Sequence, residues 1–74
     1  MPLVPTPRQV EILHHAARGL TNQQIGQLLG LSSSSVKAEI SNLLRTLGMR
    51  HRTQAVVHAI RAGWITPPEP PALS

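Results

Sequence analysis

The stretch from Ser32 to Leu47 combines an apolar stripe with slim polar side chains. Apolar residues recur there at the 4-3-4 spacing of one helical face, at Val36, Ile40, Leu43 and Leu47. At about 100° per residue, the opposite face carries Ser34, Ala38, Ser41 and Arg45, flanked by Lys37 and Asn42. Small hydroxyl, amide and cationic side chains on such a helix can bond to base edges in a DNA major groove. An ordinary amphipathic helix with a solvated face shows the same pattern, so this stretch alone leaves both interpretations open.

The charge balance is compatible with an anionic partner. Seven Lys or Arg residues stand against three acidic residues, which gives a formal net charge of +4 over 74 residues. A basic balance favours nucleic acid or an anionic membrane surface, although many basic proteins bind neither. No apolar run approaches the ~18 residues of a membrane span, and the N-terminal residues lack the pattern of a signal peptide. We therefore expect a cytoplasmic protein without a membrane partner.

The residue types argue against catalysis and against a bound metal. The chain contains no Cys, Tyr or Asp, which removes most catalytic groups and all thiolate ligands. His14 and His15 are neighbours, so on a helix their side chains diverge by about 100°. His51 and His58 have no carboxylate or thiolate close by in the sequence. We expect no enzyme activity, no metal, no cofactor and no small-molecule ligand.

Capping residues and glycines divide the chain into four expected helices. Thr6 and Thr21 are each followed three residues later by Gln, a capping-box pattern, and Ser32 is a third capping residue. Glycines follow the apolar stripes and end them. The pattern predicts helices from residue 7 to about 18, over 22–29, over 33–47, and from 51 or 52 to 62. Because only Gly30 and Leu31 separate the second helix from Ser32, we expect a helix-turn-helix hairpin.

One small all-α domain should span residues 6–65, between an extended arm at 1–5 and a Pro-rich tail at 66–74. A passive tail and a tail that binds a proline-recognising partner both remain open. We expect Trp64 to cover the core beneath the fourth helix, and Val57 to lie to one side of it. The inward-facing positions predicted for the other helices are Val10, Leu13, Ala17 and Leu20, then Ile25, Leu28 and Leu29, and finally Ala55, Val56, Ala59 and Ile60.

Several motifs, in order, resemble those of the LuxR-type helix-turn-helix family. They are Thr-Pro-Arg-Gln-x-Glu-Ile-Leu at 6–13, Ala-x-Gly-x-x-Asn-x-x-Ile at 17–25, Leu31 with Ser-Val-Lys at 35–37, Leu-Gly at 47–48, and Arg-Thr-Gln-Ala-Val at 52–56. Separate motifs in the right order make the resemblance specific. It implies a four-helix LuxR-type domain from a bacterial transcription regulator that binds double-stranded DNA. It also implies that the fourth helix serves dimerisation on DNA.

The resemblance implies two kinds of DNA contact. Base edges would face Lys37, Ala38 and Ser41. Phosphates would meet the starts of the second and third helices, at Thr21, Asn22, Ser33, Ser34 and Ser35. On the same face, Asn42 could pair with adenine from the flank, and Arg45 is expected to approach a phosphate. Arg52 is expected either to pair with Glu11 inside the domain or to contact DNA.

A homodimer on DNA would use the fourth helix, with Val57, His58 and Arg61 as the candidate interface. A helix face simply exposed to water is the alternative there. RNA polymerase is a further candidate partner.

Gly26 is a departure from the pattern of the LuxR-type family, which usually has Ala at this position. The change costs about 1 kcal/mol in helix propensity.

Three other departures from the family pattern lower the expected attraction for phosphate: Gln23, Glu39 and Thr46. These departures keep a second function open, in which the helix-turn-helix binds another regulator or RNA polymerase and has weak or no DNA binding.

Overall fold

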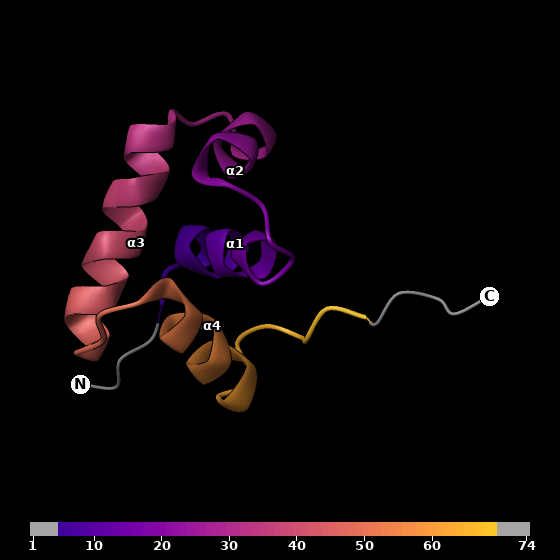
Figure 1. The fold of residues 1–74 in the computed structure, drawn as a ribbon, viewed down its shortest axis with the longest axis vertical. Helices are drawn as coiled ribbons and strands as arrows, with labels where there is room; N and C mark the ends of the chain where they lie inside the picture. The colour runs from indigo at the N-terminus through magenta and orange to yellow at the C-terminus, as the bar shows by residue number, and fades with distance from the viewer. Residues whose placement is uncertain (1–4, 70–74) are drawn as a thin grey trace.

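The computed structural model describes residues 5–69 and contains four helices and no strand among them. In chain order they are α1 (Pro7–Ala16), α2 (Asn22–Leu29), α3 (Ser33–Leu47) and α4 (Arg52–Arg61). The predicted all-α, four-helix fold is confirmed. Residues 1–4 of the expected arm and 70–74 of the expected tail lie outside the described residues. Thr66–Glu69 are exposed and non-helical, and they lead away from the helices (Figure 1).

The predicted starts of α1, α2 and α3 are confirmed by hydrogen bonds of their capping residues. Thr6 Oγ1 accepts from the amide of Gln9 at 3.1 Å, while Gln9 Oε1 accepts from the amide of Thr6 at 3.0 Å. The same reciprocal pair joins Thr21 and Gln24, at 3.1 and 2.8 Å. At the start of α3, Ser32 Oγ accepts from the amide of Ser35 at 3.1 Å. These bonds satisfy amides that a helix start leaves without an intrahelical acceptor.

The end of α1 differs from the prediction. The helix stops at Ala16, and the amides of Arg18 and Gly19 instead donate three residues back, to His15 and Ala16. Gly19 then takes a φ of +82°, which turns the chain toward α2. The predicted extension to residue 18 was therefore wrong, because a tight turn replaces the last helical bonds.

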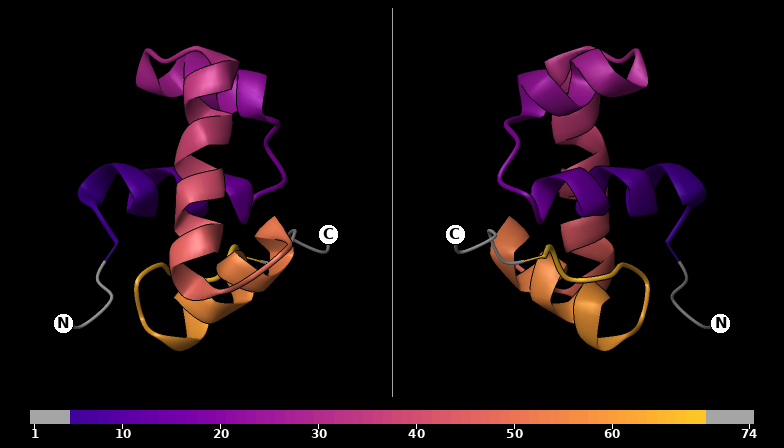
Figure 2. Two further views of the ribbon diagram at one scale, coloured as in Figure 1. Left: turned by 90° about the vertical axis from the view of Figure 1, so that its left-hand side faces the viewer. Right: turned by 90° about the vertical axis from the view of Figure 1, so that its right-hand side faces the viewer.

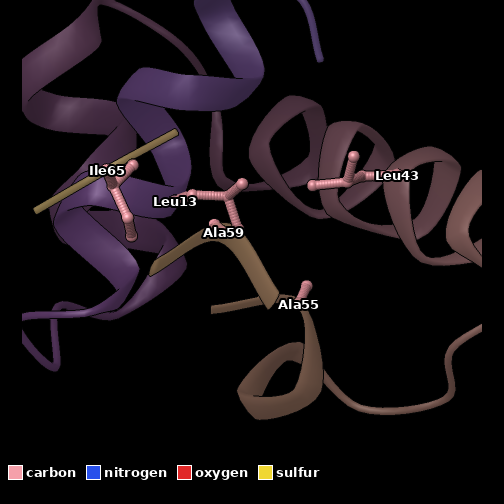
Figure 3. Packing of buried hydrophobic residues seen from close by; sticks show 5 residues of the cluster. All are labelled: Leu13, Leu43, Ala55, Ala59 and Ile65. Atoms are coloured by element: carbon pink, nitrogen blue, oxygen red, sulfur yellow. The ribbon is translucent and has the colours of Figure 1, made fainter. Parts of the chain in front are cut away.

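The core has two halves that meet on α1 and α3. The first half, here called the α4 cluster, consists of Leu13, Leu43, Ala55, Ala59 and Ile65 (Figure 3). The second, the hairpin cluster, consists of Ile12, Ile25, Val36 and Ile40. Trp64 packs against the α4 cluster, as predicted. Since each fully buried aliphatic side chain contributes about 1.5–3 kcal/mol, these contacts supply much of the stability of so small a domain.

The inward face of α2 was predicted incorrectly at one position. Leu28 is 61% exposed, whereas Gly26 is buried beside Ile25 and Leu29 is half-buried. The helix rests on the turn that follows it, and Gly26 faces that turn.

On α1, Ile12, which the sequence pattern did not single out, is buried in the hairpin cluster.

The arrangement of helices leaves one side of α3 open. Figure 1 shows α3 at one edge of the molecule, with α1, α2 and α4 all on its other side. When that edge is turned toward the viewer, α3 lies in front and α1 crosses behind it (Figure 2, left). The buried residues of α3 are Val36, Ile40 and Leu43, so its apolar stripe faces the other helices.

Candidate nucleic-acid interface

The open side of α3 carries the side chains that the sequence analysis placed there. Eight of the candidate residues are exposed: Ser33, Ser34, Ser35, Lys37, Ala38, Ser41, Asn42 and Arg45. All eight side chains are exposed, and the side of α3 away from the other helices is open (Figure 2). The face is narrow because most of its side chains are Ser or Ala, and Lys37 and Arg45 give it positive charge. Its contact with DNA stays a prediction.

The start of α3 presents main-chain donors. Ser32 accepts the amide of Ser35 and donates its own hydroxyl hydrogen to Ser35 Oγ at 3.0 Å. Ser32 therefore caps its helix, as the sequence suggested. The amides of Ser33 and Ser34 have no intrahelical acceptor at this position, and both residues are exposed. Together with the helix dipole, these amides can bind an anionic oxygen.

Hydrogen bonds from Arg52 join the start of α4 to the start of α2. Arg52 Nη1 donates to Asn22 Oδ1 at 2.8 Å, and Arg52 Nη2 donates to the carbonyl oxygen of Leu20 at 3.2 Å. Of the two alternatives expected for Arg52, the pairing with Glu11 was wrong, since the guanidinium bonds to Asn22 and Leu20 instead. Thr21 is exposed, and its Oγ1 accepts the Gln24 amide while its hydroxyl hydrogen remains available to donate.

A groove beside α3 brings in a residue that the sequence analysis missed. It is lined by Arg8, Leu31, Ser35, Ala38 and Glu39. Arg8 is exposed on the first turn of α1, whereas Glu39 is half-buried within the groove rather than on the outer face of α3. Nothing local in the sequence links residue 8 with residues 35–39, because the link depends on how α1 crosses α3.

Thr46, one of the departures from the family pattern, forms a hydrogen bond within its own helix. Thr46 Oγ1 donates to the carbonyl oxygen of Asn42 at 2.9 Å, so this hydroxyl hydrogen bonds to its own helix. Gln23 is exposed at the start of α2, where it adds no charge. The positive charge of α3 thus rests on Lys37 and Arg45, with Arg50 exposed just beyond its end.

The exposed side of α4 is hollowed. A groove there is lined by Met49, Thr53, Gln54, Val57, His58 and Arg61, and so contains all three predicted interface residues. Val57 is 42% exposed, in agreement with its predicted position to one side of the core. The ring of His58 packs edge-on against Trp64, with centroids 5.0 Å apart. The groove therefore has a largely apolar floor supported by the α4 cluster.

Titratable groups form no metal centre in the part of the chain that the structure describes. No three His, Cys, Asp or Glu side chains of residues 5–69 lie together as ligands. Within the same residues, no helix has the length and apolar character needed to cross a membrane.

His14 lies on α1, and partial burial, the nearby Arg18 charge and His15 lower its pKa from the usual 6.5.

The fold and sequence are similar to those of known regulators. Transcriptional regulatory protein DegU of Brevibacillus brevis is 40% identical over 60 residues, which are 81% of this chain and 25% of DegU. Nitrate/nitrite response regulator protein NarP of Escherichia coli is 44% identical over 54 residues, 73% of this chain and 25% of NarP. The chain thus spans about a quarter of the length of the curated relatives it matches.

The solved structure of the transcription factor GerE superposes with a TM-score of 0.80 at 31% identity, and covers 82% of this chain and 91% of GerE. Residues 4–59 match the family described as bacterial regulatory proteins, luxR family. That family is one of transcription regulators, not of enzymes. With its four helices and central hairpin, this chain belongs to the luxR family of bacterial regulatory proteins.

Proposed function

We propose that this chain is the DNA-binding module of a transcription regulator, and that α3 lies in the major groove of double-stranded DNA. The observation that supports this most strongly is the outer face of α3, which is exposed, slim and positively charged. Glu39, the acidic residue of α3, lies in the groove beside Arg8 instead. A helix of this shape fits a major groove about 12 Å wide.

Sequence-specific recognition would come from the middle of α3. Lys37 can donate to guanine, Ala38 can contact the methyl group of thymine, and Ser41 can donate or accept. Asn42, at the flank of the α3 face, would pair with adenine. The positioning contacts to phosphate come from Ser33, Ser34, Ser35 and Arg45 on α3, and from Thr21 and Asn22 on α2.

Two copies would bind adjacent half-sites through the groove on α4. A two-fold contact places the same surface of each copy against the other, so Val57, His58 and Arg61 would each contribute twice. RNA polymerase is a further proposed partner, and the cytoplasm is the proposed location. The division into an arm at 1–5, a domain at 6–65 and a tail at 66–74 belongs to the same proposal.

The second candidate function is a helix-turn-helix module that binds another regulator or RNA polymerase. The absence of positive charge at Gln23 and Thr46 favours it, and so does the exposed apolar side chain of Leu28. Such a module would bind duplex DNA weakly or not at all.

A mobility-shift titration with random-sequence duplex DNA at low salt distinguishes the two functions. We expect salt-sensitive binding that the double change Lys37→Ala with Arg45→Ala abolishes, because both positive charges of the α3 face are lost. Arg18→Ala is the control, since Arg18 is exposed in the turn between α1 and α2 and lies outside α3. No binding by the unaltered chain would favour the protein-interaction module.

A further inference from the structure

Arg52 connects two helices that do not otherwise pack together. Within residues 5–69, α2 packs on α1 and α3, and α4 packs on the same two helices, whereas the main chains of α2 and α4 do not lie against each other. The Arg52 guanidinium, at the first position of α4, spans this separation to reach Asn22 and Leu20. These bonds join residues about thirty positions apart in the sequence and are partly buried.

The bond from Arg52 determines which way the Asn22 amide points. A guanidinium carries only donors, so the atom that faces it must be the oxygen of the Asn22 side chain. The Nδ2 group of Asn22 is then turned away from Arg52. Asn22 is also the first residue of α2, where the main-chain amides have no intrahelical acceptor.

We propose that Arg52 is a positioning residue for DNA binding, which holds the Asn22 amide so that its Nδ2 donates to a DNA phosphate. The proposal rests on the proposed function and adds a role for a residue outside the hairpin. The two hydrogen bonds from one rigid guanidinium hold Asn22 and the preceding Leu20 carbonyl together. The Arg52 charge also lies behind the positive end of the α2 dipole, where it raises the potential that a phosphate meets.

Asn22→Asp separates this role from one in stability. An Asp at this position still accepts from Arg52, and an acidic residue in the first turn favours the helix, so the melting temperature should be unchanged or higher. The donor that faces the phosphate is replaced by a negatively charged acceptor. We expect affinity for a 30-base-pair random-sequence duplex at low salt to fall about 10- to 100-fold.

Arg52 itself is tested by a double-mutant cycle with Asn22. Arg52→Met should weaken binding of the same duplex about 5- to 10-fold in the unaltered background, and by less than about twofold in an Asn22→Ala background. Arg52→Lys is the matched control because it keeps the charge without the two-pronged geometry, and it should restore only part of the affinity. Circular dichroism at the binding temperature shows which variants are folded.

The outcomes separate the failure of this proposal from the failure of the proposed function. If the unaltered chain binds no duplex, the proposed function fails and this inference with it. If the unaltered chain binds but Asn22→Asp binds equally well, the inference is overturned together with the proposed phosphate contact of Asn22, while DNA binding through α3 stands. Additive losses for Arg52→Met and Asn22→Ala, or full rescue by Arg52→Lys, would also overturn it, because Arg52 would then act by charge alone. Should Arg52→Met fail to fold, Arg52→Lys decides: a partial loss of affinity supports the inference, and an affinity equal to that of the unaltered chain overturns it.

Discussion

The main chain of Leu31 contacts Gly26 through both its amide and its carbonyl oxygen. The amide of Leu31 donates to the Gly26 carbonyl oxygen at 2.8 Å, and the Leu31 carbonyl oxygen lies against the place where a Cβ atom would stand on Gly26. This contact fixes the turn between α2 and α3, in which Gly30 has a φ of +72°. Gly26 lowers the helix propensity of α2, but because it has no Cβ atom the main chain of Leu31 can approach the backbone of α2 closely.

Gly26→Val is expected to lower the free energy of unfolding by about 2–4 kcal/mol. A branched side chain would displace the Leu31 carbonyl, which is main chain and cannot rotate away, and the turn would have to open. Urea unfolding followed by circular dichroism measures the loss. Gln27→Val is the control, because Gln27 is the next residue on α2 and is exposed, so the change should cost about 0.5 kcal/mol. Equal stability of the two variants would show that the turn adapts to a side chain at position 26.

The parts of the fold that the sequence predicted correctly depend on neighbouring residues. Thr6, Thr21 and Ser32 each bond to an amide three positions ahead, so the helix starts can be recognised from a few letters. The stripe of α3 repeats over fifteen residues, which is long enough to separate its two faces. The exposed face of α3 could therefore be anticipated.

The parts that were missed depend on contacts between distant segments. α2 has only eight residues, so its apolar pattern did not show whether Leu28 or Gly26 faces inward. The bond between Arg52 and Asn22 joins two polar residues on different helices, and either could equally have been solvated. The position of Arg8 beside α3 likewise follows from packing of α1, which no local motif encodes.

Arg45→Met should reduce the salt dependence of DNA binding by one phosphate contact. Each phosphate neutralised by a cationic side chain contributes about −0.9 to the slope of log K against log salt concentration, so the slope should become less steep by about that amount. Fluorescence anisotropy with a labelled random-sequence duplex at several salt concentrations gives the slope. Arg18→Met, which removes the same charge from the turn before α2, should change it by much less. Identical slopes for both variants would remove Arg45 from the interface.

Stability should fall as the pH is lowered below about 6.5, in part because of His14. Arg18 Nη1 lies 3.2 Å from His14 Nδ1, and since a guanidinium only donates, this nitrogen accepts while unprotonated. Partial burial, followed by the charges of Arg18 and His15, lowers the pKa of His14 from 6.5 in the folded state. The unfolded chain then binds the proton more readily, so the stabilisation is present above pH 6.5 and is lost as the pH falls through the folded pKa.

Urea midpoints measured from pH 7.5 to 5 detect this loss, and His14→Gln should make the midpoint less dependent on pH in that range. His51→Gln is the control for removing an exposed histidine. An NMR titration of the His14 ring that gives a pKa of 6.5 or above would contradict the expectation. The same titration in Arg18→Met should give a higher pKa for His14 than in the unaltered chain, because one of the nearby charges is gone.

Val57→Gln should separate DNA binding by one copy from assembly of two copies. Val57 is 42% exposed in the groove on α4, so a neutral polar side chain leaves the core intact but removes apolar surface from the proposed contact. On duplexes enriched from a random pool, sedimentation should show two copies of the unaltered chain per duplex and mainly one copy of the variant. Affinity for a single half-site should be unchanged, because the α3 face is untouched. Leu28→Gln makes the same kind of change at the exposed Leu28 of α2, and should leave two copies bound. If both variants assemble like the unaltered chain, the groove on α4 does not join the two copies, and its residues are a solvated helix face.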